Sequence, residues 1–374
     1  MHPYQEDPLA GHPPPVIVPR AEHSISRANI SPNALKVLYR LHRSGYLAYL
    51  VGGSVRDLLL GRRPKDFDIA TNARPQEIRR LFRNSRIIGR RFRLAHVFFR
   101  DAIVEVATFR ASPEAPESPN DWHEGEEETA EEEAATEPLP ARPEEDVYGT
   151  PAEDARRRDF TVNALFYNIA DFTVIDHVGG IADLERGVIR TIGDPDQRFI
   201  EDPVRMMRAL EYAVRLGFSV DPPTVEAIER QQALIAEASS SRLTYELLEC
   251  LRSGSAARIH EAWRRAGLFS RAFPDLPLDT ADSVQVLEVI DAQIAAGSPL
   301  ADASLLGGFF LPRFLALAVE ETDGNGRVNN AQLLARLRAI IAPAAASMHL
   351  SNQALHLMHQ GLFTLTKMVR PPDR

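Results

Sequence analysis

The chain has 374 residues, of which 44% are hydrophobic and 25% are charged. This composition is ordinary for a globular protein with a real core, and it excludes a mostly disordered, collagenous or disulfide-stapled chain. The single cysteine, Cys250, can form no intramolecular disulfide, so we interpret it as a core residue of a protein from a reducing compartment. The length predicts two or three domains.

No stretch reaches the about 18–20 apolar residues of a membrane helix. The first residues carry neither the basic lead nor the apolar segment of a secretory signal, and they include three consecutive prolines. We therefore expect a cytoplasmic protein without a membrane partner, and a flexible tail over residues 1–27.

The net charge of −9 is unevenly distributed. Residues 113–147 hold fourteen acidic residues and one arginine, so this segment carries −13 and the rest of the chain +4. The segment has no apolar period, which predicts a disordered acidic insertion. A slightly basic body is compatible with an anionic partner such as RNA.

The segments around the insertion predict one interrupted domain of mixed helices and strands over residues 28–178. Helical patterns cover residues 34–44 and 75–83, and β-like runs cover residues 47–51, 67–70, 87–99, 103–109, 161–169 and 173–178. The remainder of the chain is nearly all helical in spacing, at residues 210–216, 223–238, 241–251, 257–266, 282–295 and 330–340.

The most specific motif is Val-Gly-Gly-Ser-Val-Arg-Asp at residues 51–57. A strand that runs into Gly52 and Gly53 and then a helix allows a phosphate to approach backbone N–H groups. Arg56 would add a charge-assisted contact. The alternative is an ordinary turn followed by a surface pair of Arg56 and Asp57.

Three carboxylates are candidates for a metal site. Asp66 and Asp68 share one face if they lie in a strand, and two crowded carboxylates suit a hard cation such as Mg²⁺. Glu105 lies in an apolar run that we expect to be buried, where a charged carboxylate needs a partner. The alternatives are a solvated acidic edge and a salt bridge to a nearby arginine.

Arginines form two further candidate groups. Eight of them lie between residues 74 and 93, which is either a solvated basic helix face or a surface for phosphates of a nucleotide or RNA. The second group is Arg156, Arg157 and Arg158, which precede Asp159 and Asn163; these side chains suit a triphosphate and a ribose, although Asp159 could simply cap a helix.

The last candidate motif is Glu-Asp-Pro-Val-Arg-Met-Met-Arg at residues 201–208. Pro203 suits a first helical position, with Asp202 as its cap. Arg205 and Arg208 then lie one turn apart on the same face. Taken alone, the motif equally describes a capped helix with local ion pairs.

These motifs, in this order, resemble the class II nucleotidyltransferases, which comprise tRNA CCA-adding enzymes and bacterial poly(A) polymerases. The resemblance runs from about residue 23 to residue 251, interrupted by the acidic insertion. It implies the α+β class: a polymerase-β-like head with a mixed sheet, followed by an all-helical neck (residues 179–252), which binds nucleobase and RNA, and an RNA-binding body (residues 253–374).

The resemblance also implies residue roles. Asp66, Asp68 and Glu105 match the metal-binding catalytic carboxylates, and a two-metal Mg²⁺ site would make Asp66 the least replaceable. The matching nucleotide-binding residues are Gly52, Gly53, Arg56, Asp57, Arg158, Asp159, Asn163, Asp202, Arg205 and Arg208. Within that set, Asp202 and Arg205 hydrogen-bond the incoming base, so that the protein acts as template, and Arg208 reaches the phosphates. Asp183 and Gly187 match a flexible link between head and neck.

Residues 87–97, Ile-Ile-Gly-Arg-Arg-Phe-Arg-Leu-Ala-His-Val, look like the block of the bacterial poly(A) polymerase subgroup. We therefore expect transfer of AMP from ATP to RNA 3′ ends, with RNA contacts from Arg90, Arg91 and Arg93 and with RNA-decay proteins as partners. The alternatives are CCA or A addition to tRNA, and an inactive RNA-binding scaffold.

Overall fold

The computed structural model describes residues 13–89, 93–111, 148–276, 281–322 and 329–369. Contacts divide the chain into two units. Unit 1 comprises Met1–Glu201 and Ser219–Thr224, and unit 2 comprises Asp202–Phe218 and Val225–Arg374. The acidic insertion predicted at residues 113–147 lies outside the described residues.

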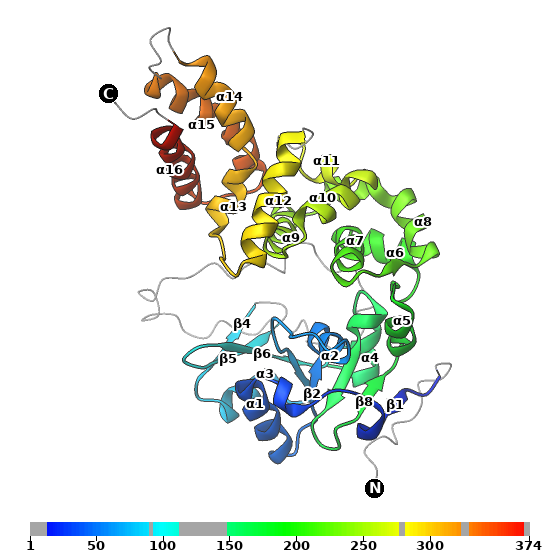
Figure 1. The fold of residues 1–374 in the computed structure, drawn as a ribbon. Helices are drawn as coiled ribbons and strands as arrows, with labels where there is room; N and C mark the ends of the chain where they lie inside the picture. The colour runs from blue at the N-terminus through cyan, green and yellow to red at the C-terminus, as the bar shows by residue number, and fades with distance from the viewer. Residues whose placement is uncertain (1–12, 90–92, 112–147, 277–280, 323–328, 370–374) are drawn as a thin grey trace, which may run out of the picture. The chain divides into compact units, whose positions relative to one another are not determined.

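Unit 1 is built on an eight-stranded mixed sheet, of order β1-β8-β7-β2-β3-β6-β5-β4 (Figure 1). Its only parallel pair within the described residues joins β3 to β6. A two-stranded parallel pair joins β9 to β10. The strands are β1 (Val16–Val18), β2 (Ala48–Val51), β3 (Ile69–Thr71), β4 (Ser85–Ile88), β5 (Leu94–Phe98), β6 (Ile103–Thr108), β7 (Leu165–Asn168), β8 (Val174–Asp176), β9 (Val188–Ile189) and β10 (Ser219–Val220).

The helices of unit 1 begin at clear sequence signals. The hydroxyl of Ser31 accepts from the N–H of Asn33 and Pro32 occupies the first turn of α1, while a Thr150–Glu153 capping box starts α4. The helices are α1 (Pro32–Arg43), α2 (Gly53–Leu59), α3 (Pro75–Leu81), α4 (Pro151–Arg156), α5 (Gly180–Arg186) and α6 (Pro195–Glu201), with 3₁₀ turns at Arg20–Glu22, Arg27–Asn29 and Thr161–Asn163.

Each face of the β4–β6 part of the sheet has a distinct environment. Val104 and Val106 of β6 point to a buried face, and Glu105 between them points to the open face. Helix α1 contacts β2, β3 and β6, and α3 contacts β4 and β5. These two helices therefore cover the valine face and leave the Glu105 face accessible.

Two sequence predictions of flexible segments in unit 1 are wrong. Strand β1 pairs antiparallel with β8, and the imidazole Nε2 of His23 lies 2.8 Å from the carbonyl oxygen of Phe172, so residues 16–23 belong to the fold and not to a flexible tail. The predicted flexible link is the second error. Asp183 is buried in α5, where it accepts from Thr161 Oγ1 at 2.8 Å and pairs with Arg190.

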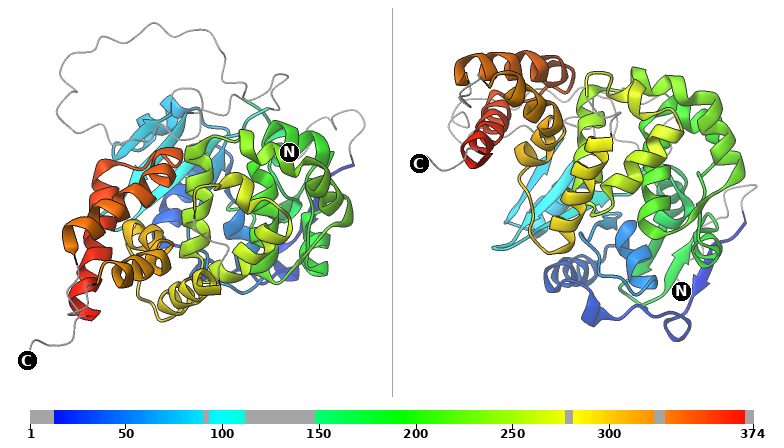
Figure 2. Two further views of the ribbon diagram at one scale, coloured as in Figure 1. Left: turned by 90° about the horizontal axis from the view of Figure 1, so that it is seen from above. Right: turned by 45° about the horizontal axis from the view of Figure 1, so that its top comes forward.

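Unit 2 is all helical, as the spacing predicted, and Figure 2 shows it from two further directions. Trp263 is completely buried and donates its indole N–H to the carbonyl of Met207 at 2.9 Å, which ties two helices together. The helices are α7 (Val204–Leu216), α8 (Pro222–Gln231), which begins in unit 1, α9 (Ser240–Arg252), α10 (Ala256–Arg265), α11 (Phe269–Ala272), α12 (Ala281–Ala295), α13 (Asp302–Gly308), α14 (Leu311–Glu320), α15 (Asn330–Ser347) and α16 (Asn352–Val369), with a 3₁₀ turn at Gln232–Glu237.

The α+β class is confirmed, but unit 1 continues beyond the predicted head, to Glu201. The division of unit 2 into neck and body at residues 252/253 stays a prediction. In the described part of the chain, no single helix is long and apolar enough to cross a bilayer. Only α13 and α14 taken together, bent by 61°, reach that length and composition.

Candidate active site

The glycine turn predicted at residues 51–57 connects β2 to α2. Gly52 has φ +71°, a conformation that residues with a Cβ rarely adopt. Ser54 donates its hydroxyl to the carbonyl of Val51 at 2.8 Å and so fixes the turn from inside. The sequence therefore predicted this strand–turn–helix correctly, and glycine is required at its first position.

Arg56 connects this turn to the second arginine motif. Its side chain is buried; Nε and Nη2 each lie 2.8 Å from Asp57 Oδ1, and Nη1 donates to Asn163 Oδ1 at 2.6 Å. Asp57 holds one side of the guanidinium while Asn163, 107 residues later, holds the other. The structure thus brings together residues that the sequence analysis singled out separately.

Arg158 lies beside the same turn. It donates to Asp154 Oδ2 of α4 at 3.0 Å, and its guanidinium carbon lies 5.3 Å from the centroid of the Phe166 ring. A Cβ on Gly52 would be 3.2 Å from Arg158 Nη1. We call Gly52, Arg56, Arg158 and Asn163 the guanidinium cluster.

Two other predicted residues lie next to this cluster. Gly53 begins α2, and a Cβ there would lie 3.4 Å from Arg56 Nη2. Asp159 is half-buried between α4 and the following 3₁₀ turn, and its backbone carbonyl accepts from Ile192 N–H at 3.1 Å. The 3₁₀ turn that follows begins at Thr161 with Phe160 at its cap position, so Asp159 is not a helix cap.

The candidate metal carboxylates lie at one end of the parallel pair β3–β6. Asp66 and Asp68 precede β3, which begins at Ile69, so the prediction that both lie in a strand is wrong. Asp68 still accepts Val51 N–H at its backbone carbonyl, at 3.0 Å. Because Ile69 pairs with Val106 in parallel register, Asp68 neighbours Glu105 one residue before.

The charges of these carboxylates influence one another. The pKa of Asp68 is raised to about 6, first by burial and then by the charges of Glu105 and Asp66, while the charge of Arg158 opposes the rise. Partial burial first and then the charge of Asp66 raise the pKa of Glu105. The three acids therefore repel one another. Arg158 of the guanidinium cluster lies close enough to lower the pKa of Asp68.

Glu105 differs from its predicted environment. Its side chain is 49% exposed on the open face of β6, so it is not the buried charge that the apolar run indicated. Across the sheet, Glu105 pairs with His96 of β5, whose Nε2 lies 3.5 Å from Glu105 Oε1. Burial lowers the pKa of His96, so the imidazole is neutral at pH 7.

In the described ranges, no three His, Cys, Asp or Glu side chains are already arranged as a metal site. The chemistry of the donors nevertheless fits a hard cation, because all three side chains offer carboxylate oxygens and their charges raise the pKa values of Asp68 and Glu105. Asp66, Asp68 and Glu105 are therefore the residues that could hold such an ion.

The predicted base-binding residues begin unit 2. Asp202 is 8% exposed, and its carboxylate accepts from the N–H of Val204, the first residue of α7, at 3.2 Å. The cap position itself is occupied by Pro203, so Asp202 satisfies the helix start from one residue further out than predicted. Arg242 of α9 donates to the Asp202 carboxylate at 2.5 Å, whereas Arg205 Nε lies 3.9 Å from it. The sequence analysis missed Arg242, because only the packing of α9 on α7 brings it to Asp202.

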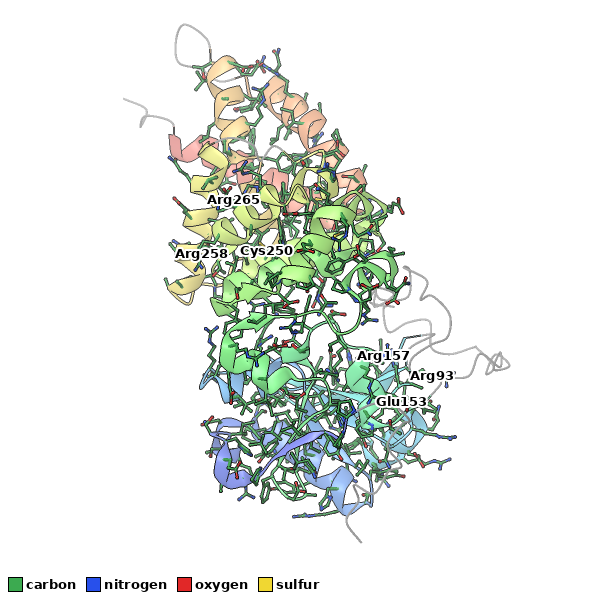
Figure 3. The ribbon with its side chains drawn as sticks, turned by 90° about the vertical axis from the view of Figure 1, so that its right-hand side faces the viewer. Arg93, Glu153, Arg157, Cys250, Arg258 and Arg265 are labelled. Carbon is green, nitrogen blue, oxygen red and sulfur yellow. The ribbon has the colours of Figure 1, made fainter. Side chains whose placement is uncertain are left out.

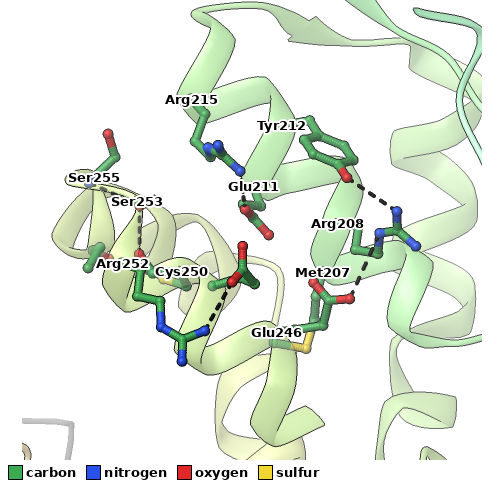
Figure 4. A network of polar contacts seen from close by, with 12 residues as sticks. Met207, Arg208, Glu211, Tyr212, Arg215, Glu246, Cys250, Arg252, Ser253 and Ser255 are labelled. Atoms are coloured by element: carbon green, nitrogen blue, oxygen red, sulfur yellow. Dashed lines mark hydrogen bonds and ion pairs between the residues drawn. The ribbon is translucent and has the colours of Figure 1, made fainter. Parts of the chain in front are cut away.

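Arg208 lies in a polar network between α7 and α9 (Figure 4). Its Nη2 donates to Tyr212 Oη at 3.2 Å, and its Nε lies 3.9 Å from Glu246 Oε1. A second pair in the same network joins buried Glu211 to Arg215 at 2.9 Å. These contacts hold Arg208 at the surface between the two helices.

Of the predicted RNA contacts, Arg90 and Arg91 lie outside the described residues. Arg93 is exposed just before β5, and Figure 3 labels it. The same figure labels Arg258 and Arg265 on α10, which are both exposed. The sequence analysis assigned that half of the chain to RNA binding without naming these residues.

Comparison with known proteins identifies the family. The sequence model described as "Poly A polymerase head domain" matches residues 48–190, and the one described as "Probable RNA and SrmB- binding site of polymerase A" matches residues 217–278. Poly(A) polymerase I of Salmonella typhi is 43% identical over 331 residues, which cover 86% of this chain and 69% of that protein.

More distant relatives share the fold. The CCA-adding enzyme of Bacillus pumilus is 38% identical over 221 residues, which cover 59% of this chain and 50% of that protein. The solved structure of the Bacillus stearothermophilus CCA-adding enzyme in complex with CTP aligns with a TM-score of 0.55 and 24% identity, over 91% of this chain and 84% of that one. With the Salmonella protein matched over more than two thirds of its length, the chain belongs to the poly(A) polymerase family of class II nucleotidyltransferases.

Proposed function

We propose that the protein is a template-independent poly(A) polymerase, which transfers AMP from ATP to RNA 3′ ends in the cytoplasm and releases pyrophosphate. The observation that carries this proposal is the 43% identity to the Salmonella poly(A) polymerase over 331 residues. The carboxylate trio beside the guanidinium cluster supports it, because phosphoryl transfer needs both charge neutralisation and phosphate positioning.

In this proposal, the guanidinium cluster binds the triphosphate. Arg56 is held on two sides, by Asp57 and Asn163, and so offers a fixed fork to phosphate oxygens. Arg158 is fixed by Asp154 and lies over Gly52, where the absence of a side chain leaves room for the ligand. Preorganised cations of this kind favour the charge that develops during transfer.

Asp66, Asp68 and Glu105 would hold two Mg²⁺ ions. Burial first and then mutual repulsion raise the pKa values of Asp68 and Glu105, and a bound cation would relieve that repulsion. When bound, such ions lower the pKa of an attacking hydroxyl and neutralise a leaving pyrophosphate. His96, whose Nε2 lies 3.5 Å from Glu105 Oε1 across the sheet, would help to orient this carboxylate.

Residues at the start of α7 would bind and select the base. Asp202 and Arg205 would hydrogen-bond the adenine, and Arg208 would reach the phosphates of the ATP. The contact from Arg242 supports the first role, since it fixes the Asp202 carboxylate before any nucleotide arrives. A carboxylate that is already oriented loses little entropy on binding.

The second candidate is CCA or A addition to tRNA, and the 38% identity to a Bacillus CCA-adding enzyme favours it. A primer-extension experiment separates the two. Purified protein with Mg²⁺ receives ATP, CTP or both, on an oligoadenylate primer and on a tRNA that lacks its terminal CCA. Long products from ATP alone on the oligoadenylate support poly(A) polymerase; addition of three nucleotides to the tRNA, with CTP required, supports the alternative.

The inactive scaffold is tested in the same assay with Asp66→Ala. Loss of adenylation with retained RNA binding supports the enzyme. A wild-type protein that binds RNA but extends no primer with any nucleotide would support the scaffold.

A further inference from the structure

The outer face of α1 carries a shallow surface groove of about 520 Å³, lined by residues of this helix and by Ser44 after it. Leu35 and Tyr39 are half-buried at its floor, and exposed Lys36, Arg40 and Arg43 stand around them. These three cations follow one another at helical spacings of four and three residues, so they form one row about 10 Å long.

In the described residues, these cations contact aromatic rings and one amide, and not carboxylates; Lys36 Nζ donates to Asn33 Oδ1 at 3.3 Å. The ammonium of Lys36 lies 5.7 Å from the centroid of the Phe99 ring. The guanidinium of Arg40 lies 5.3 Å from the Phe82 ring, and that of Arg43 lies 5.8 Å from the Tyr39 ring. Cation–π contacts position a charge without neutralising it.

Helix α3 extends the same cationic surface. Phe82, which Arg40 covers, directly follows α3, so the two helices meet at this ring. Arg79 donates to the carbonyl of Arg83 at 2.8 Å, and Arg80 and Arg83 are exposed beside it. We call Lys36, Arg40, Arg43, Arg79, Arg80 and Arg83 the α1–α3 surface.

In the described part of the chain, no ion pair joins a member of the α1–α3 surface to a carboxylate. The nearest acid on α3, Glu77, accepts from the backbone N–H of Arg74 at 2.7 Å and also hydrogen-bonds Tyr46. By contrast, Arg56, Arg158 and Arg190 of the same unit are each paired with aspartates. The surface therefore carries concentrated positive charge that the described residues of unit 1 do not pair with carboxylates.

This surface is separate from the active site. Helices α1 and α3 cover the face of the sheet to which Val104 and Val106 point, whereas Glu105 points to the opposite face. Figure 1 shows α1 and α3 against this side of the sheet. A ligand bound on α1 consequently cannot be the nucleotide at the carboxylates.

We propose that the α1–α3 surface binds the sugar–phosphate backbone of single-stranded RNA, as a second contact for RNA longer than the primer end in the active site. The inference rests on the proposed function, since it takes the RNA substrate as its ligand. Two features of the surface match those of proteins that bind single strands without sequence preference: a row of cations, and an aromatic floor on which a base stacks. Charge alone would equally fit an acidic protein, but Tyr39 at the groove floor favours RNA.

The test compares charge-matched variants in unit 1. Lys36→Gln/Arg43→Gln removes two charges from the α1 row, and Arg80→Gln/Arg83→Gln removes two from α3. The control is Arg20→Gln/Arg186→Gln, which removes two exposed charges outside the surface. Fluorescence anisotropy with a long labelled oligoadenylate, measured over a range of salt, gives affinity and salt slope. Thermal unfolding checks that each variant is folded.

Each test variant should bind the long oligoadenylate on the order of 10-fold more weakly at 0.1 M salt, with the slope of log K against log salt reduced by about 1.4, since each phosphate contact contributes about 0.7 on a single strand. Extension of a very short primer by ATP should stay within twofold of wild type. The control should keep the wild-type affinity and slope.

Unchanged RNA affinity in both test variants would overturn the inference even if the wild type polymerises. Binding of polyglutamate by wild type but not by the variants, with RNA affinity unchanged, would overturn it in favour of an acidic protein partner. Failure of the wild type to extend any primer would instead refute the proposed function, and the anisotropy data would still decide whether the surface binds RNA.

Discussion

Arg56 and Asn163, 107 residues apart, meet at 2.6 Å between a guanidinium nitrogen and an amide oxygen. Since Asp57 occupies another edge of the same guanidinium, the orientation of Arg56 is fixed before a ligand binds. If Arg56 binds the triphosphate as proposed, Asn163 acts on the nucleotide through Arg56, in addition to any direct contact with a ribose.

Replacing Arg56 by Lys should reduce kcat/KM for ATP about 100-fold, because an ammonium cannot bridge Asp57, Asn163 and a phosphate at once. Steady-state primer extension measures the loss. Arg190→Lys is the matched control: Arg190 also bridges two aspartates, Asp183 and Asp221, but outside the site. It should lower thermal stability and leave KM for ATP unchanged. Equal kinetic effects of the two variants would contradict a role of Arg56 in binding ATP.

The two glycines of the turn should respond differently to alanine. Gly52→Ala places a Cβ in a left-handed conformation and 3.2 Å from Arg158, so we expect a loss of about 1–2 kcal/mol in unfolding free energy and at least a 10-fold loss of activity. Gly53→Ala, without a positive φ and inside α2, should be tolerated in stability. Urea unfolding and primer extension compare them; the prediction fails if Gly53→Ala is the more damaging variant.

The sequence predicted the local elements well because their signals are local. The strand, two glycines and helix at residues 48–59 are visible in seven consecutive letters, and the helical spacing after residue 200 recurs in α7, α9 and α10. The tail prediction failed because β1 gains its stability from pairing with β8, more than 150 residues later.

The site could be predicted only as separate motifs. Parallel pairing of β3 with β6 decides that Asp68 neighbours Glu105, and cross-strand pairing decides that His96 faces Glu105. Neither register is encoded within one segment. Arg242 was missed for the same reason: the residues around it in the sequence do not indicate that it pairs with Asp202, 40 residues earlier.

Replacing Arg242 by Gln should destabilise the protein by about 3 kcal/mol, because it leaves the buried Asp202 carboxylate without its closest cation. If Asp202 reads the adenine, discrimination of ATP against CTP should also fall roughly 10-fold, and Arg242→Lys should restore part of it. Single-nucleotide incorporation with each triphosphate gives the ratio.

Arg215→Gln controls for stability alone. It breaks the pair with buried Glu211 in the same helix, away from Asp202, so it should lower the melting temperature without changing discrimination. If Arg242→Gln behaves in the same way, Arg242 supports the fold and does not position the base-reading carboxylate.

The carboxylate trio predicts a specific pH dependence of metal-free protein. The pKa of Asp68 rises from 3.8 to about 6 on folding, so its contribution to stability is fully present below pH 3.8 and is lost as the pH rises through about 6. Asp68→Asn keeps the shape and stays neutral. In EDTA, the unfolding free energy of Asp68→Asn minus that of wild type should therefore increase between pH 5 and pH 7.5. The variant should have no polymerase activity.

Glu185→Gln is the control, because it removes an equal charge from an exposed position of α5. In urea unfolding with EDTA, its unfolding free energy should change with pH as that of wild type does. Added Mg²⁺ should stabilise wild type more at pH 7.5 than at pH 5, because protonation of Asp68 competes with the cation, and should stabilise Asp68→Asn least. If Asp68→Asn and wild type instead show parallel pH profiles in EDTA, the three acids do not repel one another in the folded protein, and the electrostatic case for a metal site there is lost.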